Sequence, residues 1–354
     1  MSQRRYGQLS LADSVARRAG RSEVFLAKVQ RLVDWAALEH EMKPIAKARI
    51  GAPGYPPLLM LKVLLLEQWY GLSDPGVEDA LSDRLSFRRF VGLALDEAPP
   101  DHSTISRFRN SLARHGLTDR VFAEVLRQIQ AQKLILRRGT MIDATLVEAA
   151  VNRPRKPKSQ ATADAAPAEP PAEPAPDAGA AGVPAAKAGR APSKLVLSKL
   201  DPDARWSKKG AVRNFGYKGH IGVDRGSGII RKRLFTPGNV ADTTPADDLI
   251  CGDERAVYAD AAYDTHARRA ALKQRGINDR ISHRANKHHG LTTSQERRNR
   301  GIANRRSAIE RVFAIAKRVM GWCRARYRGL ARNAAHFDMI CTALNLRRMA
   351  AQLP

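Results

Sequence analysis

Three acidic residues that lie far apart in the chain occur in settings where a carboxylate can do chemistry. Asp143 lies within the apolar segment TMIDATLVEA, and Asp260 ends the short apolar run AVYAD. Glu310 follows Arg306 by four residues and precedes Lys317 by seven, which places the three on one face of a helix. A carboxylate among apolar residues is costly to bury without a partner such as a cation. The three acids are therefore candidate metal ligands, although a solvent-facing acid or an ordinary ion pair within the helix also explains each of them alone.

The net charge indicates which substrate such ligands would act on. The 354 residues include 61 Lys and Arg against 35 Asp and Glu, a formal charge of +26, which favours a polyanion through phosphate contacts. Cutting a phosphodiester requires an activated water and a stabilised leaving oxygen, and two Mg²⁺ ions about 4 Å apart can supply both. Mg²⁺ prefers carboxylate and water ligands, and Mn²⁺ is expected to substitute for it. We therefore expect a nucleic acid as the partner and two divalent ions as the cofactor.

Other functional classes find little support in the sequence. The cysteines Cys251, Cys323 and Cys341 are too far apart to predict a zinc site or a redox pair, and they fit a reducing compartment. The most apolar run, Leu58–Leu66, is interrupted by Lys62 and is too short to cross a bilayer. The first residues do not resemble a signal peptide. We expect a cytoplasmic protein with no membrane role.

The elements that precede the first acid are expected to be helices. The run LLMLKVLLLEQWYGL follows Pro56 and is apolar nearly all round, which predicts a helix buried at the centre of a domain and ended by Gly71. Ser73 is expected to cap a second helix, and the apolar residues from Phe87 to Leu93 predict a third. Together these segments predict a compact helical unit.

A basic helix is expected next, in the segment PPDHSTISRFRNSLARHGL. Ser103 is a suitable N-cap, and Gly116 is a suitable residue just beyond the C-terminus of this helix. Arg107, Arg109 and Arg114 are expected to face mostly outward. In that position they either contact DNA or form a solvated helix face.

From residue 139 the pattern changes to strands and turns. GTMIDATLVEAA predicts a strand around Asp143, and FGYKGHIGVDRGSGIIRKRLFT predicts a β-hairpin. AVYADAAYD predicts a short strand that runs into a helix over residues 265–275, and residues 296–350 are expected to be helical and rich in Arg. Between Ser159 and Pro192, 14 of the 34 residues are Ala and 7 are Pro, a composition that predicts a flexible, disordered insertion placed at residues 155–196.

Several basic side chains in this region are candidate DNA contacts. Lys218 and His220 lie in the predicted hairpin, and Arg306 and Lys317 accompany the third acid. A solvent-facing strand lysine is the alternative interpretation of Lys218. From residue 280 to 348 there are 17 Lys or Arg against three acids. This asymmetry predicts the side of the protein that faces DNA.

The blocks TMIDATLVEA, VYADAAYDT and the Arg-x₃-Glu-x₆-Lys pattern that ends at Lys317 resemble the three catalytic blocks of the DDE transposases of bacterial insertion sequences, in the branch with a Tyr-Arg-Glu-Lys signature. FGYKGHIGVD and the N-terminal stretches PPLLMLKVLLLEQWYGLSDPGVEDALSDRLSFRRFVGL and DHSTISRFRNSL are also similar to that family. The resemblance covers nearly all of the chain except the Ala/Pro-rich insertion. Each block alone is modestly specific, and their order together is highly specific.

This resemblance implies a fold, a reaction and partners. The fold is α/β, with a ribonuclease-H-like mixed-sheet catalytic core over residues 138–354 and an all-helical N-terminal domain over residues 1–137 that binds DNA ends and supports assembly. The enzyme is expected to bind the terminal inverted repeats of its element, cleave there and join the ends to target DNA, with Asp143, Asp260 and Glu310 as catalytic metal ligands. It is expected to be bacterial, associated with the nucleoid, and at least dimeric on DNA.

One position departs from the family pattern. Where the signature has Tyr, three residues before Arg306, this chain has Ala303, whose side chain has neither a hydroxyl nor a ring to offer to a flipped or bent strand. A hairpin-forming cleavage route is therefore not carried over. Trp322 offers a stacking surface in principle, but a tryptophan beside an apolar helix face favours a core position.

Two alternative functions remain at the level of the sequence. A domesticated metal-dependent nuclease, which cuts DNA but no longer joins it, would have the same acids. A DNA-binding regulator with an inactive catalytic domain would use the helical N-terminus, although the retention of all three acids argues against it.

Overall fold

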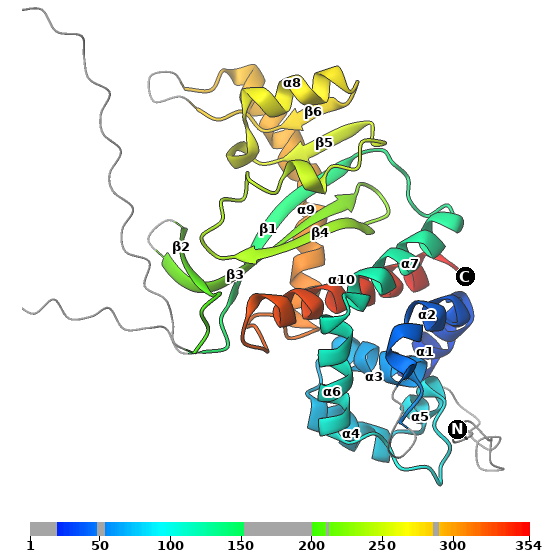
Figure 1. Ribbon diagram of the computed structural model, residues 1–354. Helices are drawn as coiled ribbons and strands as arrows, with labels where there is room; N and C mark the ends of the chain where they lie inside the picture. Colours follow the sequence, from blue (N-terminus) through cyan, green and yellow to red (C-terminus); the bar gives the residue numbers. More distant parts are fainter. Residues whose placement is uncertain (1–19, 48–53, 152–199, 210–211, 286–289) are drawn as a thin grey trace, which may run out of the picture.

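The computed structural model describes residues 20–47, 54–151, 200–209, 212–285 and 290–354. It is a mixed α/β fold: in Figure 1 a helical N-terminal unit lies below a twisted sheet, and helix α10 crosses between them. The predicted insertion at residues 155–196 falls outside the described residues. Within the described ranges, none of the helices combines the length and apolarity needed to span a bilayer.

The helical unit is built around α3. Its elements are α1 Arg21–Leu32, α2 Trp35–Glu41, the 3-10 helix η2 Lys43–Lys47, α3 Pro57–Tyr70, α4 Asp74–Asp83, α5 Leu85–Val91, α6 His102–Arg114 and α7 Leu117–Ala131. Every side chain from Leu59 to Trp69 is buried, and Gly71 ends α3 with a φ of 64°, a conformation that glycine adopts without strain. The Ser73 side chain caps α4 by accepting the N–H of Gly76. The predictions of a central apolar helix and of this cap are confirmed.

The N-cap of α6 differs from the prediction. Asp101, not Ser103, caps the helix: its carboxylate accepts the Thr104 N–H at 2.7 Å and the Ser103 hydroxyl at 2.6 Å. The hydrogen bond from Ser103, followed by that from Thr104, lowers the pKa of Asp101 to about 2. A carboxylate is favoured here because the negative charge also faces the positive end of the helix dipole. Gly116 lies just beyond the helix with a φ of 62°, as predicted.

The sheet combines antiparallel and parallel pairing. Its strands are β1 Thr140–Glu148, β2 Arg205–Lys209, β3 Val212–Asp224, β4 Ile230–Pro237, β5 Ala256–Ala259 and β6 Asn278–Ile281. Their order is β2-β3-β1-β5-β6, and β4 also pairs with β3. β3 is antiparallel to β1, β2 and β4, whereas β5 is parallel to both β1 and β6. The predicted first strand, the hairpin and the strand before Asp260 are confirmed.

Short helices connect the strands of the parallel half. The 3-10 helices η3 Asp247–Leu249 and η4 Ala261–Tyr263 lie on either side of β5, and α8 His266–Gln274 connects β5 to β6. Buried side chains around β5, β6, η3 and α8 form a small hydrophobic cluster of their own. The predicted helix at residues 265–275 is confirmed.

The C-terminal region forms two helices, α9 Thr293–Arg318 and α10 Leu330–Gln352. The chain breaks between them at Gly321, whose φ is 67°, and returns to the end of β1, where the Ala325 N–H donates to the Glu148 carbonyl at 2.7 Å. The predicted helical content of residues 296–350 is confirmed, and the break at Gly321 divides it into two helices.

Helix α10 joins the helical unit to the sheet. The Trp69 indole N–H donates to the Ala343 carbonyl at 2.9 Å, and the Asn345 side chain exchanges two hydrogen bonds of 2.8 Å with the backbone of Ile230 on β4. One cluster of buried hydrophobic side chains therefore extends from α1 to α10 and includes residues of the sheet. The division into domains 1–137 and 138–354 stays a prediction.

Trp322 occupies the core, as predicted. It is 2% exposed and stacks on Phe337 with ring centroids 4.8 Å apart. Gly219 makes room for these rings, because a Cβ at this position would lie 2.5 Å from the Trp322 ring. Trp322 thus stabilises the packing of β3 against α10 and presents no surface to a base.

Candidate active site

Asp143 and Asp260 are neighbours on adjacent parallel strands. In the register of β1 and β5, Thr140 lies beside Val257 and Met141 beside Tyr258. Asp260 continues β5 with an extended backbone, so the same register places it beside Asp143, at the strand spacing of about 4.8 Å. Two acids 117 positions apart in the chain are thereby brought together where the parallel pairing of β1 with β5 ends.

The carboxylates of these two acids are held by the backbone and by Arg306. One oxygen of Asp143 accepts the Ala144 N–H at 2.9 Å, and one oxygen of Asp260 accepts the Ala262 N–H at 2.8 Å. The second oxygen of each lies 3.6 Å and 3.8 Å, respectively, from the same Nη2 of Arg306. The two second oxygens are therefore within roughly 7.5 Å of each other, a span that two metal ions about 4 Å apart can bridge.

Glu310 lies on α9, one turn beyond Arg306, and is exposed. Helix α9 packs along β1 and β5. The Arg306 end of this stretch reaches Asp143, and Lys317 donates its ammonium N–H to the Leu146 carbonyl of β1 at 3.1 Å. Glu310 lies between these two contacts along the helix. The structure thus places Glu310 on the stretch of α9 that runs along β1.

The sequence reasoning missed two further groups beside these acids. The Tyr263 hydroxyl is fully buried and has no hydrogen-bond partner among the described residues. Burial, and then the negative charges of Asp143, Asp242 and Asp260, raise its pKa. Asp242 lies in a loop and pairs with Lys218 at 2.7 Å. No signal in the sequence distinguishes Asp242 from other loop acids, because only the fold brings it to the site.

Two predicted DNA contacts are corrected because their side chains are not at the surface. His220 is fully buried, with its Nε2 2.8 Å from the Thr236 hydroxyl; burial, reinforced by Lys218, lowers its pKa to about 4 against the opposing charge of Asp242. Arg109 is 7% exposed. Its guanidinium is hydrogen-bonded to Glu67 and Asp74 instead of facing outward. Neither side chain has the accessible surface that a phosphate contact requires.

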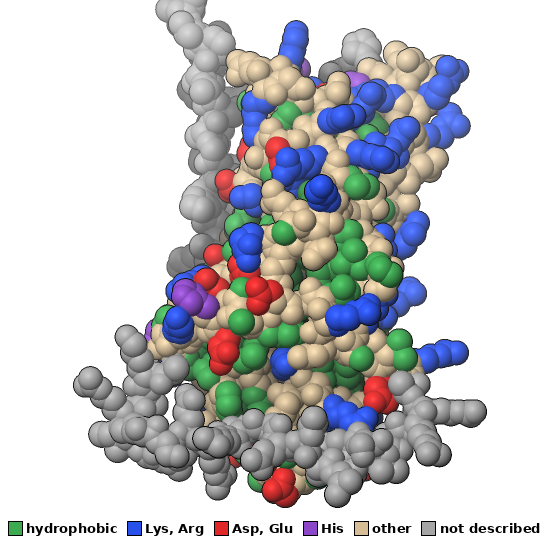
Figure 2. Space-filling view, turned by 90° about the vertical axis from the view of Figure 1, so that its right-hand side faces the viewer, with side chains coloured by type: hydrophobic (Ala, Val, Ile, Leu, Met, Phe, Trp, Pro, Cys, Tyr) green, Lys and Arg blue, Asp and Glu red, His purple; other side chains and the backbone are tan. Residues whose placement is uncertain are grey.

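The other predicted contacts differ in accessibility. Arg107 and Arg114 are exposed on α6, as expected. The Lys218 side chain is only 13% exposed and is held by Asp242 and by the Val240 carbonyl, both at 2.7 Å. On the face drawn in Figure 2, Lys and Arg side chains gather over the upper part, at the height of α8, β5 and β6 in Figure 1. On α9, the exposed basic residues are Arg297, Arg300, Arg305, Arg311 and Arg318.

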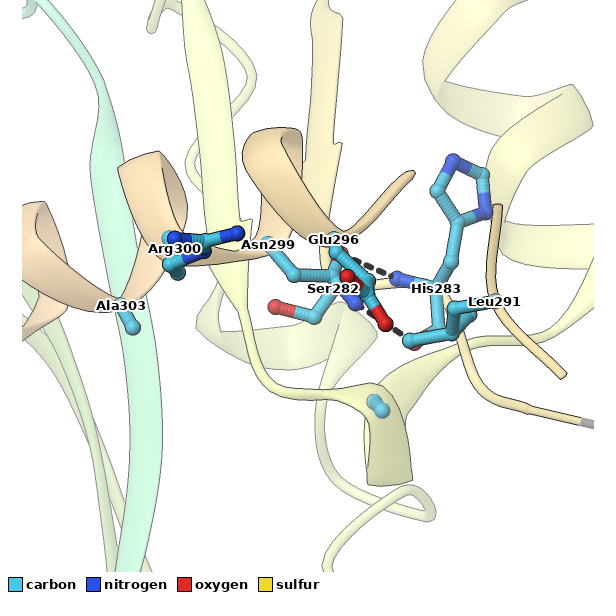
Figure 3. Close-up of a pocket in the computed structure, with 8 residues that line it drawn as sticks. Ser282, His283, Leu291, Glu296, Asn299, Arg300 and Ala303 are labelled. Atoms are coloured by element: carbon cyan, nitrogen blue, oxygen red, sulfur yellow. Dashed lines mark hydrogen bonds between the residues drawn. The ribbon is translucent and has the colours of Figure 1, made fainter. Parts of the chain in front are cut away.

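A pocket of about 580 Å³ lies at the start of α9, and Ala261, the residue after Asp260, is part of its lining (Figure 3). Its wall includes Ala303, which stands where the signature has Tyr. The side chain of Asn299 and the backbone of His283 exchange hydrogen bonds of 2.9 and 3.0 Å, which tie the loop after β6 to α9. The remaining lining residues are Ala261, Ser282, Leu291, Glu296 and Arg300. Asp143, Asp260 and Glu310 do not line this pocket.

A second group with potential metal ligands lies elsewhere. Among the described residues, the ligand atoms of Cys251, Asp253 and Glu254 all lie within 4.8 Å of one another, and no group this tight contains Asp143, Asp260 or Glu310. However, Arg231 binds both oxygens of Asp253 at 2.6 and 2.7 Å. The Glu254 carboxylate accepts the backbone N–H groups of residues 251 and 252. These acids already have partners within the protein, so the cluster is explained as a structural loop anchor.

Two models of known protein families match the chain. A family model described as "Transposase DDE domain" matches residues 136–346, more than half of the chain. A second model, described as "Transposase domain (DUF772)", matches residues 14–111. No solved structure matches the chain.

Proposed function

Because the chain belongs to the DDE transposases of insertion sequences, we propose that it binds the terminal inverted repeats of its element, cleaves at the ends and joins them to target DNA. The family makes it an enzyme that acts on DNA and depends on divalent metal ions. The finer assignment is that Asp143, Asp260 and Glu310 hold two Mg²⁺ ions, which Mn²⁺ can replace. The observation that carries this proposal is the side-by-side placement of Asp143 and Asp260.

The residues present suit such ions. Their donors are carboxylate oxygens, which Mg²⁺ prefers to thiols and imidazoles. Arg306 contributes a positive charge between the two aspartates, so the position already favours a cation. When bound, the metal ions supply an activated water or 3′ hydroxyl and stabilise the leaving oxygen.

The protein's own residues position the reactants. Backbone N–H groups hold one oxygen of each aspartate and leave the other oxygen directed toward α9. Glu310 completes the ligand set from the helix. Lys317, which lies further along the same helix, and Arg306 flank the acids and are proposed to contact the DNA backbone, Lys317 as a point charge and Arg306 through two parallel hydrogen bonds.

The sheet supports a ribonuclease-H-like core. Antiparallel pairing on one side of β1, parallel pairing on the other and a helical connection between β5 and β6 agree with that assignment. The exposed Arg107 and Arg114 stay proposed DNA contacts of the helical unit, and assembly into at least a dimer on DNA stays a proposal that measurement of the complex mass can test.

Substitution of the acids tests the proposal. Asp143→Asn, Asp260→Asn and Glu310→Gln should each abolish Mg²⁺-dependent cleavage of a duplex that carries the element's end, while binding of that duplex is retained. Asp248→Asn removes an exposed acid of η3 and should cleave like the wild type. Cleavage that survives in any of the three acid variants would refute the assignment of that residue.

A joining assay separates the transposase from a domesticated nuclease. The wild type should join a pre-cut end to a target plasmid, whereas a nuclease would only cut. If no variant or wild-type protein nicks DNA in Mg²⁺ or Mn²⁺, the remaining candidate is a DNA-binding regulator.

A further inference from the structure

Arg306 occupies the space between the two aspartates. Its side chain is 13% exposed, and its Nη2 lies 3.6 Å from Asp143 Oδ2 and 3.8 Å from Asp260 Oδ2. Two carboxylates on neighbouring strands repel each other, and a guanidinium between them offsets that repulsion. Arg306 therefore acts as the counter-charge of this acid pair.

The contact is looser than the contacts that Arg268 and Arg231 make with Asp247 and Asp253. Both distances exceed the usual range of an N–H···O hydrogen bond, about 2.7–3.2 Å, and Arg306 Nε is buried without a hydrogen-bond partner among the described residues. By contrast, Arg268 donates to Asp247 and to the Tyr263 carbonyl at 2.7 Å, and Arg231 binds Asp253 at 2.6 and 2.7 Å. Arg306 is thus held mainly by charge, and a stronger cation can replace it.

The Arg306 guanidinium also occupies the position near both carboxylates that a shared metal ion would take. A Mg²⁺ ion binds oxygens at about 2.1 Å, whereas these two carboxylate oxygens lie 3.6 and 3.8 Å from Arg306 Nη2. An ion at the position of Nη2 would therefore need both carboxylates to move closer. Among the described residues, neither Asp143 nor Asp260 belongs to a group of three or more potential ligands that lie within 4.8 Å of one another. A divalent ion shared by these oxygens would need the position that Arg306 Nη2 holds.

We propose that Arg306 is a displaceable counter-ion that competes with divalent metal for Asp143 and Asp260 and thereby sets the metal affinity of the site. This inference rests on the proposed metal-binding role of the two aspartates. Once displaced, the guanidinium has all its donors available, and its fork shape suits a phosphate of the bound DNA. Because binding effects are reciprocal, a phosphate that draws Arg306 away also favours metal binding.

Calcium titration of the full-length protein tests the proposal without any cleavage. We compare the wild type with Arg306→Met, which keeps an unbranched apolar side chain but removes the charge, and with Arg311→Met, which removes an exposed charge five residues further along the same helix. Isothermal titration should show Ca²⁺ binding to Arg306→Met about tenfold or more tighter than to the wild type, within the usual range of coupling between sites. Arg311→Met should stay close to the wild type.

A conservative variant and a thermal measurement keep the proposal testable if Arg306→Met does not fold. Arg306→Lys keeps the positive charge but lacks the planar fork, so its Ca²⁺ affinity should lie between those of the wild type and Arg306→Met. Since a bound ligand stabilises the folded state, the same Ca²⁺ concentration should raise the Tm of Arg306→Met more than that of the wild type. If Arg306→Met does not fold, a higher affinity of Arg306→Lys supports the proposal, and an unchanged or lower affinity overturns it.

Asparagine variants separate the two levels of inference. If Asp143→Asn and Asp260→Asn lose Ca²⁺ binding while Arg306→Met binds no more tightly than the wild type, the counter-ion proposal fails and the metal site stands. If Ca²⁺ binding is unchanged in both asparagine variants, the proposed metal site fails, and the counter-ion proposal fails with it.

Discussion

Replacing Arg109 by Met distinguishes a structural arginine from a DNA contact on α6. The Arg109 guanidinium donates to Glu67 at 3.0 and 3.1 Å and to Asp74 at 2.6 and 2.9 Å. The Glu67 side chain has no exposed surface, whereas that of Asp74 is 22% exposed. The substitution therefore leaves a carboxylate buried on α3 without its main counter-charge, while the more exposed Asp74 can be solvated.

The expected loss is large and depends on pH. Removing one partner of a buried ion pair costs about 3–5 kcal/mol of unfolding free energy. Burial already raises the pKa of Glu67 to about 7 from its ordinary 4.5, against the lowering effect of Arg109. The folded state thus holds the Glu67 proton more tightly than the unfolded state, so the contribution of Glu67 is most favourable below about pH 4.5 and declines as the pH rises through 7. Without Arg109 the pKa should rise further, and the loss should be larger at pH 8 than at pH 5.

Urea unfolding at pH 5 and pH 8 measures these effects. Arg107→Met, on the same helix but exposed, should change the unfolding free energy by less than about 0.5 kcal/mol. The double variant Glu67→Gln/Arg109→Met should recover part of the loss, because a neutral amide is less costly to bury than a carboxylate. An Arg109→Met protein that unfolds like the wild type at both pH values but binds DNA weakly would refute the reasoning and restore Arg109 as a DNA contact.

Three further outcomes are expected. Gly219→Ala should lower the unfolding free energy by about 1–3 kcal/mol, because the new Cβ would lie 2.5 Å from the Trp322 ring; Gly20→Ala, where nothing lies within 4 Å of the added carbon, is the matched control in urea unfolding. Since burial lowers the pKa of His220 to about 4, the stability that neutral His220 contributes should be lost as the pH falls from about 6.5 toward 4. Its NMR resonances should show no titration near pH 6.5, and a midpoint there would contradict its burial. DNA affinity measured by fluorescence anisotropy should fall steeply with salt; a flat dependence would contradict binding through the many exposed Arg and Lys side chains.

Much of the local structure could be predicted from the sequence because its causes are local. The apolar run after Pro56 specifies a buried helix, and Gly71 and Gly116 end helices through their tolerance of positive φ. The predicted cap of α6, Ser103, differs from the observed cap, Asp101, because both residue types are good caps and only the backbone geometry decides between them.

The candidate site depends on non-local pairing that the sequence does not encode in any simple pattern. Asp143 and Asp260 could be recognised as unusual acids, but their adjacency follows from the parallel register of β1 and β5. The burial of Arg109 and His220 was missed for the related reason that α3, α4 and β4 supply their partners from elsewhere in the chain. Helix periodicity alone assigned Arg109 to the outer face.

The packing of α10 has a consequence for how this protein is made. Residues 330–352 leave the ribosome long after α3, yet Trp69 of α3 finds its hydrogen-bond acceptor on α10, and both helices share one hydrophobic cluster. Until α10 has been synthesised, the part of the helical unit's apolar surface that α10 covers is therefore exposed. A product that stops before residue 330 would leave that surface exposed to chaperones and proteases. Incomplete copies of the chain should consequently be removed by quality control rather than persist as folded fragments.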